Sequence, residues 1–209
     1  MSKVILMATK NPHKKERFRY YLSELSLSVI SFGDIDKEIE VVEDGKTPEE
    51  NALKKAQSGF KATGIPTFGI DYWFYIKGIP DEKQPGPYVR RIFTGDGKER
   101  IEASDEEMLD YYTKLVEGLG GKTEGMWNSA IGLVVRSGKV YTEKFARKTL
   151  LTSVRSPRRT EGEPLNSIQI DPLTGKYFTD LSKKEWLRLQ AEREKGYIEF
   201  FKSHLEDLS

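Results

Sequence analysis

The chain has 209 residues, of which 34 are Lys or Arg and 33 are Asp or Glu, so its formal net charge is +1. This length predicts one domain with a sizeable core, or one domain with an extra lobe, rather than a string of small modules. A balanced charge argues against a general nucleic-acid-binding protein, although a local basic patch facing phosphates is compatible with it. Because the chain has no Cys, a disulfide framework, a thiolate metal site and a cysteine nucleophile are excluded.

Hydropathy gives no indication of a membrane protein. No apolar run approaches the ~20 residues that span a bilayer, and the first one, residues 4–8, is too short for the core of a signal peptide. We therefore expect a soluble, cytoplasmic protein with no membrane partner.

The first third of the chain predicts strands that alternate with helices. Residues 3–9 have the composition of a strand, and a polar loop and apolar residues at helical spacing follow them. A second short strand is expected at 28–32. Thr47-Pro48-Glu49-Glu50 is a strong helix start with a capping box, and the helix should run over 47–63. Residues 66–76 predict a buried strand or hairpin that contains a single acid, Asp71.

The remaining two thirds are expected to continue this pattern. The predicted segments are a long loop or small excursion at 78–97, a helix from Ser104 to about 118–121, a hairpin of 126–136 with 139–149, a basic loop at 153–164, and a short strand at 168–172 that stops at a turn. Over 182–208 we expect either one amphipathic helix or two that are separated near Gly196. Strands that alternate with helices, together with one clear hairpin, favour an α/β fold with a mixed sheet.

The polar segment over residues 9–15 leaves a strand and enters a helix. Its backbone N–H groups, the helix dipole and Lys10, Lys14 and Lys15 are suited to an anion such as a phosphate. A solvated loop with surface lysines is the alternative, because the segment has no glycine-rich phosphate cradle.

Acidic residues form a second group of candidates. Glu43 and Asp44 precede the 47–63 helix, and Asp71 lies in an apolar strand. Carboxylates at the ends of neighbouring elements suit Mg²⁺, which takes oxygen ligands and leaves room for water and phosphate. A buried Asp71 must find a cation, a metal or hydrogen-bond donors, unless it lies at an exposed strand end. Lys55 is a candidate to point toward the same acids, with a solvated helix face as the alternative.

Several other kinds of active site find no support. The two His residues, His13 and His204, are far apart and lack zinc-ligand spacing. The chain also has neither a Gly-x-Ser-x-Gly elbow nor a phosphate-binding P-loop motif. Zinc-enzyme, serine-hydrolase and P-loop interpretations therefore fall away.

The order of the segments resembles the inosine/xanthosine triphosphate pyrophosphatase family. Residues 9–14 match the family pattern Thr-x-Asn-x-x-Lys, and residues 43–56 match Glu-x-Gly-x-Thr-Phe-x-Glu-Asn-Ala-x-x-Lys-Ala at all positions except the Phe. Residues 85–91 are similar to Pro-Gly-x-Tyr-Ser-Ala-Arg. The resemblance is strong over 4–60 and weak beyond 126.

The later motifs depart from the family pattern. The Asp-Asp-Ser-Gly motif reads Ile-Asp-Tyr-Trp over residues 70–73, so only its second acid is kept. The base-pocket motif Phe-Gly-Tyr-Asp-Pro is represented by residues 168–172, and the Ser-His-Arg motif by residues 191–193. In this comparison the phosphate half of the site is retained, whereas the base-reading half is rebuilt.

The resemblance implies an elongated two-lobed α/β fold with a central mixed sheet flanked by helices, a cleft between the lobes, and a homodimer. It implies a Mg²⁺-dependent enzyme that hydrolyses a nucleoside triphosphate, such as a non-standard purine nucleotide, to monophosphate and pyrophosphate. The residues that it assigns are Asp71 and Lys55 as catalytic groups, Glu43 and Asp71 as metal ligands, and Thr9, Lys10, Asn11, Lys14, Tyr72, Asp171 and Arg193 as substrate-binding groups.

Three alternatives stay open. Tyr72 and Trp73 either form a stacking surface for a base or pack in the core. The chain is either an active hydrolase or a nucleotide-binding or regulatory protein that has lost hydrolysis. A nucleic-acid scaffold that uses the arginines at 155, 158 and 159 is a third reading, disfavoured by the near-zero charge.

Overall fold

The computed structural model describes residues 3–95 and 97–208, and leaves aside the side chains of residues 13 and 192–194. The chain divides into two compact units. Unit 1 comprises Met1–Tyr72, Ser129–Phe145 and Ala191–Ser209, and unit 2 comprises Trp73–Asn128 and Ala146–Gln190. Each unit is described by itself, and the predicted cleft between two lobes stays a prediction.

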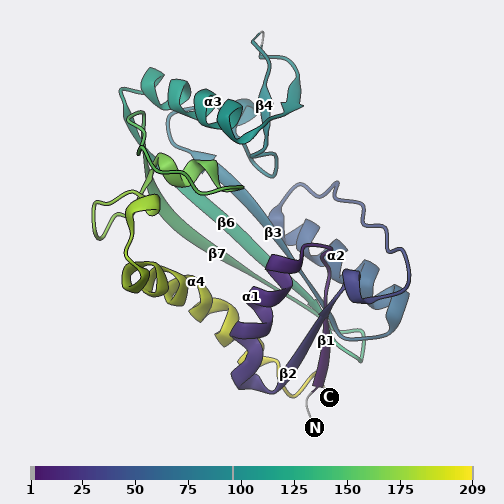
Figure 1. Cartoon of the computed structure of the whole chain (residues 1–209). Helices are drawn as coiled ribbons and strands as arrows, with labels where there is room; N and C mark the ends of the chain where they lie inside the picture. The colour runs from purple at the N-terminus through teal and green to yellow at the C-terminus, as the bar shows by residue number, and fades with distance from the viewer. Residues whose placement is uncertain (1–2, 96, 209) are drawn as a thin grey trace. The chain divides into compact units, whose positions relative to one another are not determined.

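Six strands hydrogen-bond in the order β2-β1-β3-β6-β7-β8, and β4 and β5 form a separate pair (Figure 1). The strands are β1 (Lys3–Met7), β2 (Leu27–Ser31), β3 (Thr67–Ile76), β4 (Arg91–Phe93), β5 (Arg100–Glu102), β6 (Lys122–Val134), β7 (Val140–Thr152) and β8 (Gln169–Ile170). The helices are α1 (Pro12–Leu22), α2 (Pro48–Thr63), α3 (Asp105–Gly118) and α4 (Lys183–Ser203). Because β1 pairs in parallel with β2 and β3 while β7 and β8 are antiparallel, the α/β fold with a mixed sheet is confirmed.

The β1 strand of unit 1 has an apolar core on both of its faces. Its side chains alternate between the two faces, as strand geometry requires. Ile5 and Met7 join a cluster that contains Phe18 of α1 and Phe201 of α4. Leu6 and Ala8 belong to a second cluster, formed with residues of the segment that follows β2. The strand is therefore buried on both faces, as expected for a parallel strand.

Two glycines let α2 lie unusually close to the strands. A Cβ atom on Gly132 of β6 would lie 2.5 Å from the backbone nitrogen of Leu53, and one on Gly69 of β3 would collide with the carbonyl oxygen of Ala52. Any larger residue would push the helix outward. This close approach puts Lys55, in the next turn of α2, directly over β3.

Unit 2 has its own core around α3. Met108, Leu109, Tyr112 and Val116 of this helix belong to a cluster that also contains Phe74 of β3. The helix begins at Ser104 with the predicted capping box, since Ser104 and Glu107 bond each other's backbone N–H groups. The capping box predicted at the start of α2, in unit 1, forms only in part. Thr47 caps the helix, but the Glu50 carboxylate accepts from Lys46 N at 2.7 Å rather than from the backbone N–H of Thr47.

The segment predicted over residues 78–97 as a long loop or small excursion contains a strand that was not predicted. Arg91–Phe93 and Arg100–Glu102 form the antiparallel pair β4–β5, with Ile92 opposite Ile101. Each strand has only three residues, with two apolar ones in β4 and one in β5. Such a short segment carries too little alternation for a pattern to reveal it.

The structure refines two further predicted segments. The strand predicted at 168–172 has only two residues, because the chain turns at Asp171, whose carbonyl accepts from Gly175 N at 2.9 Å. Of the two arrangements expected over 182–208, the structure has the single helix, since α4 continues through Gly196. A Cβ atom there would lie 2.6 Å from the Phe145 ring, so this glycine makes room for an aromatic neighbour rather than ending the helix.

No described helix has both the length and the apolar character that crossing a membrane requires.

Candidate functional site

The turn between β1 and α1 is built by its own polar side chains. Thr9 Oγ1 accepts from Asn11 N at 3.1 Å, and Asn11 Oδ1 caps α1 by accepting from Lys14 N at 3.1 Å. The first turn of α1 contains no acidic residue, whereas α2 and α3 carry acids there. The positive end of the α1 dipole is therefore not neutralised by acids in its own first turn, which favours an external anion.

Asp71 is buried, with 6% of its surface exposed, and it has polar partners. Lys55 Nζ lies 2.7 Å from Asp71 Oδ1, and Asn51 Nδ2 donates to Asp71 Oδ2 at 3.2 Å. The acid thus has both the cation and the donor that burial requires. Both partners come from α2, whose close approach to β3 brings them within reach.

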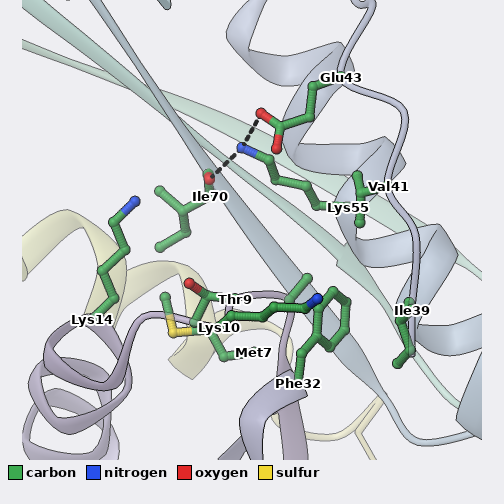
Figure 2. Close-up of a pocket in the computed structure, with 11 residues that line it drawn as sticks. Met7, Thr9, Lys10, Lys14, Phe32, Ile39, Val41, Glu43, Lys55 and Ile70 are labelled. Carbon is green, nitrogen blue, oxygen red and sulfur yellow. Dashed lines mark hydrogen bonds and ion pairs between the residues drawn. The ribbon is translucent and has the colours of Figure 1, made fainter. Parts of the chain in front are cut away.

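Lys55 also binds Glu43, the second acid predicted to hold a metal. Its Nζ lies 2.9 Å from Glu43 Oε2, and it donates to the carbonyl oxygen of Ile70 at 3.4 Å (Figure 2). The loop that carries Glu43 is tied to α2, because Asn51 Oδ1 accepts from Gly45 N at 2.7 Å. The two carboxylates therefore meet at a single ammonium group.

These groups border a pocket of about 270 Å³ in unit 1. One part of its wall is apolar, and the other part carries a hydroxyl group, three lysines and a carboxylate. The lining residues are Met7, Ala8, Thr9, Lys10, Lys14, Phe32, Ile39, Val41, Glu43, Lys55 and Ile70. The pocket thus combines an excess of positive charge with a carboxylate at its edge, which suits a polyanion bound together with a cation.

Lys14 enters the pocket wall from α1. Burial lowers the pKa of its ammonium group, and the positive charge of Lys55 lowers that pKa further, while Asp71 and Glu43 act in the opposite direction. Its Nζ lies 5.3 Å from the centroid of the Tyr72 ring. Two ammonium groups that disfavour each other's charge are stabilised by a bound anion.

The donor set fits a divalent cation that keeps water and substrate oxygens among its ligands. Among the described residues there is no group of three or more His, Cys, Asp or Glu side chains that could hold a metal ion. Glu43 and Asp71 supply two carboxylates, which are enough for Mg²⁺ when water and substrate phosphates complete its coordination. Their convergence on Lys55 shows that both can neutralise one cation.

The predicted residues that line this pocket are Thr9, Lys10, Lys14, Glu43 and Lys55. Asp71 contacts the pocket residue Lys55, and Asn11 caps the helix that carries Lys14. Lys10 lies on the exposed rim, 3.7 Å from Glu38. Tyr72 packs against the unit 1 core instead of lining the pocket. Asp171 belongs to unit 2, where it is 1% exposed and binds Arg188 at 2.7 Å and Thr174 Oγ1 at 2.8 Å. The side chain of Arg193 lies outside the described residues.

The basic loop at 153–164 also has partners of its own. Arg155 forms ion pairs with Glu106 and Asp110 of α3 at 3.2 and 2.6 Å. This pairing argues against a free arginine patch for nucleic acid.

Two residues that hold the buried acids were not predicted as site residues. Asn51 lies in the Glu-Asn-Ala segment of the matched motif, but no role was predicted for it. Arg188 gave no signal, because an arginine on an amphipathic helix looks like any solvated side chain. A spacing rule finds neither, because their role depends on tertiary contacts.

Comparisons with known proteins place the chain in a family. Residues 5–185 match the model of the Ham1 family. The chain is 29% identical to a dITP/XTP pyrophosphatase of Syntrophobacter fumaroxidans over 87% of this chain and 74% of that protein. It is 31% identical to a dITP/XTP pyrophosphatase of Geobacter sulfurreducens over 76% of this chain and 75% of that protein.

Solved structures show the same fold at lower identity. A nucleoside-triphosphatase / dITP/XTP pyrophosphatase from Mycobacterium abscessus is 20% identical, with a TM-score of 0.71 over 94% of this chain and 98% of that one. A HAM1 protein from Coxiella burnetii is 21% identical, with a TM-score of 0.72 over 98% of both chains.

Proposed function

The chain belongs to the Ham1 family, and on that premise we propose that it is a hydrolase that splits a nucleoside triphosphate into a monophosphate and pyrophosphate. The proposed substrates are non-standard purine nucleotides such as ITP, XTP and dITP, or another modified nucleotide. The observation that carries the proposal is the meeting of Lys55 with Glu43 and Asp71 beside a pocket that Lys14 also lines.

Phosphate binding is assigned to the α1 turn and to two lysines. The uncompensated N-terminus of α1, Thr9 and the Lys14 ammonium offer donors and positive charge to a triphosphate. Lys55 changes partners in this scheme, from the two carboxylates to phosphate oxygens. A lysine suits such an exchange because its ammonium is a point charge without a fixed bonding plane.

The two acids are assigned to binding the metal ion and to activating the attacking water. Glu43 and Asp71 would hold Mg²⁺, which, when bound, supplies positive charge that offsets the charge developing on the leaving pyrophosphate. Asp71 would also orient the attacking water and accept its proton, while Asn51 holds the carboxylate in place at 3.2 Å. The chain itself therefore contributes positioning and charge neutralisation.

A nucleotide screen tests the proposal. Standard, deaminated and otherwise modified nucleoside triphosphates would be incubated with the protein and Mg²⁺, and pyrophosphate release would be measured. We expect release from at least one non-standard purine nucleotide, and none when Mg²⁺ is chelated. Inactivity toward every nucleotide, in a protein that still binds triphosphates, would instead favour a nucleotide-binding or regulatory protein.

We also propose that the protein is a homodimer, as the family resemblance implies, and that it is cytoplasmic, as expected from its hydropathy. Sedimentation or light scattering at micromolar concentration would test the dimer. A mass equal to the 24.0 kDa of one chain would contradict it.

A further inference from the structure

Tyr72 stands directly after Asp71, where the matched motif has serine. Successive side chains of a strand point to opposite faces, so Asp71 faces α2 while Tyr72 faces the other side. On that side Tyr72 packs against the core cluster that contains residues of α1 and α4. The bulky ring is thus adjacent to the site in sequence but separated from the Asp71 carboxylate by the strand.

The face of the Tyr72 ring meets the Lys14 ammonium. Lys14 Nζ lies 5.3 Å from the ring centroid, within the range of a cation–π interaction. Within the described part of the chain, no carboxylate forms an ion pair with Lys14. Its charge is opposed by burial and by Lys55, and is favoured at longer range by Asp71 and Glu43. The ring is therefore an identifiable short-range group that stabilises this cation.

Tyr72 is itself held in position. Its hydroxyl forms a hydrogen bond with Tyr197 of α4, and the Tyr197 hydroxyl lies 2.7 Å from Ser129 Oγ in a buried pair. The Tyr197 ring in turn packs against Phe18 and Phe145, with centroids 5.4 and 4.8 Å away. A ring fixed by hydrogen bonding and packing offers Lys14 one defined surface.

We propose that Tyr72 is a positioning residue that acts through Lys14, holding its ammonium charged and directed toward the phosphate chain of the substrate. This inference rests on the proposed function, because it assigns Lys14 to the phosphates. A ring suits the task better than an acid, because a carboxylate would neutralise Lys14 and repel the incoming phosphates, whereas a π-face leaves the full positive charge available. The role differs from base stacking, which the sequence left open for Tyr72.

A double-mutant cycle with a ligand that has no base tests the proposal. Binding of inorganic tripolyphosphate in the presence of Mg²⁺ would be measured by calorimetry for the wild type, Y72L, Y72F, K14M and K14M/Y72L. We expect Y72L to raise Kd about 3- to 10-fold, in line with the usual strength of a cation–π contact. Y72F keeps the ring and should restore Kd to within about twofold of the wild type. K14M/Y72L should bind as K14M does, because Tyr72 has nothing left to position.

Each opposite result overturns the inference. If Y72L weakens binding as much in the K14M background as in the wild type, the loss reflects packing and not Lys14. If Y72L weakens binding of ITP but leaves that of tripolyphosphate unchanged, Tyr72 contacts the base. Failure of the wild type to bind tripolyphosphate also overturns it. By contrast, intact binding and an intact cycle without pyrophosphate release from any nucleotide would defeat only the proposed hydrolysis.

Discussion

Asp71 and Asp171 are both almost fully buried, and the chain compensates their charges in different ways. The partners of Asp71 are the ammonium of Lys55, which Glu43 shares, and the amide of Asn51. Asp171 binds Arg188 and the Thr174 hydroxyl, and its backbone closes the turn that follows it. Burial alone therefore does not distinguish a functional acid from a structural one.

The difference lies in what the partners are able to do. Lys55 stands at the edge of a pocket and can transfer its ammonium to an arriving anion without leaving α2. The Thr174 hydroxyl belongs to the turn that Asp171 itself begins, so it cannot leave without unfolding that turn. Asp71 lies beside a pocket and has a partner that can bind substrate instead, so it is suited to a catalytic role. Asp171 is held by its own turn, so it is suited to stabilising the fold.

The largest expected effect is on activity at Asp71. Asp71→Asn should lower the rate of pyrophosphate release by about 10²- to 10⁴-fold, because it removes the proposed base and one metal ligand. The unfolding free energy should change by about 1 kcal/mol although the pair is buried, since Lys55 keeps its contact with Glu43 and the new amide oxygen can still accept a hydrogen bond from Lys55. Steady-state rates and urea unfolding of the same preparation would measure both.

Asp36→Asn is the matched control for Asp71, because it removes the same charge at an exposed position of unit 1. Its rate should equal that of the wild type. Undiminished Mg²⁺-dependent release from the Asp71 variant would end the proposed mechanism.

The reverse pattern is expected at Asp171. Asp171→Asn should cost about 2–3 kcal/mol of unfolding free energy, less than a fully buried pair, because the Arg188 side chain is partly exposed and can be solvated again. The value of kcat in the folded fraction should change little. Urea unfolding with rates per folded molecule would separate the two, whereas a normal stability with a base-dependent rise in KM would show that this acid reads the nucleobase.

A smaller effect is expected at Glu43, the half-exposed acid that shares Lys55 with Asp71. Glu43→Gln should raise the Mg²⁺ concentration for half-maximal activity on the order of tenfold, because one of two carboxylates is lost. Asp44→Asn is the control one residue away, since Asp44 pairs with Lys54 on the exposed side. Equal Mg²⁺ curves for the two variants would remove Glu43 from the metal site.

The sequence predicted most of the elements of unit 1, because its signals are local. Thr47 and Pro48 mark the start of α2, and the apolar run around β3 marks a buried strand. The β4–β5 pair was missed because strands of three residues show too little alternation. The choice between one helix and two over 182–208 could not be made from the sequence, because it depends on a residue distant in sequence, Phe145, which packs beside Gly196.

The candidate site likewise contains contacts that the sequence predicted and contacts that only the tertiary structure reveals. The meeting of Lys55 with Glu43 and Asp71 was expected from the spacing and the family motif, and the geometry agrees with it. The position of Tyr72 against Lys14 was not predictable, because it depends on the face of β3 and on the partner of the Tyr72 hydroxyl in α4. A motif specifies which residues are present, and tertiary packing decides which of them touch.

The smallest effect is expected at an exposed acid that has neither a pocket nor a buried charge. Bonds to Lys176 and then to Ser182 lower the pKa of Glu185 from 4.5 to about 2. A depressed pKa means that this acid stabilises the fold above its unfolded pKa, and that the contribution is lost as pH falls from about 4.5 to about 2. Glu185→Gln should therefore lower the midpoint of thermal unfolding by about 1–2 °C at pH 7, and the difference from the wild type should shrink at pH 3. Lys176→Met should reproduce much of this change, because its ammonium group is the largest cause of the shift. A pH-independent difference would show that the charge of Glu185 is not the cause of its effect on stability.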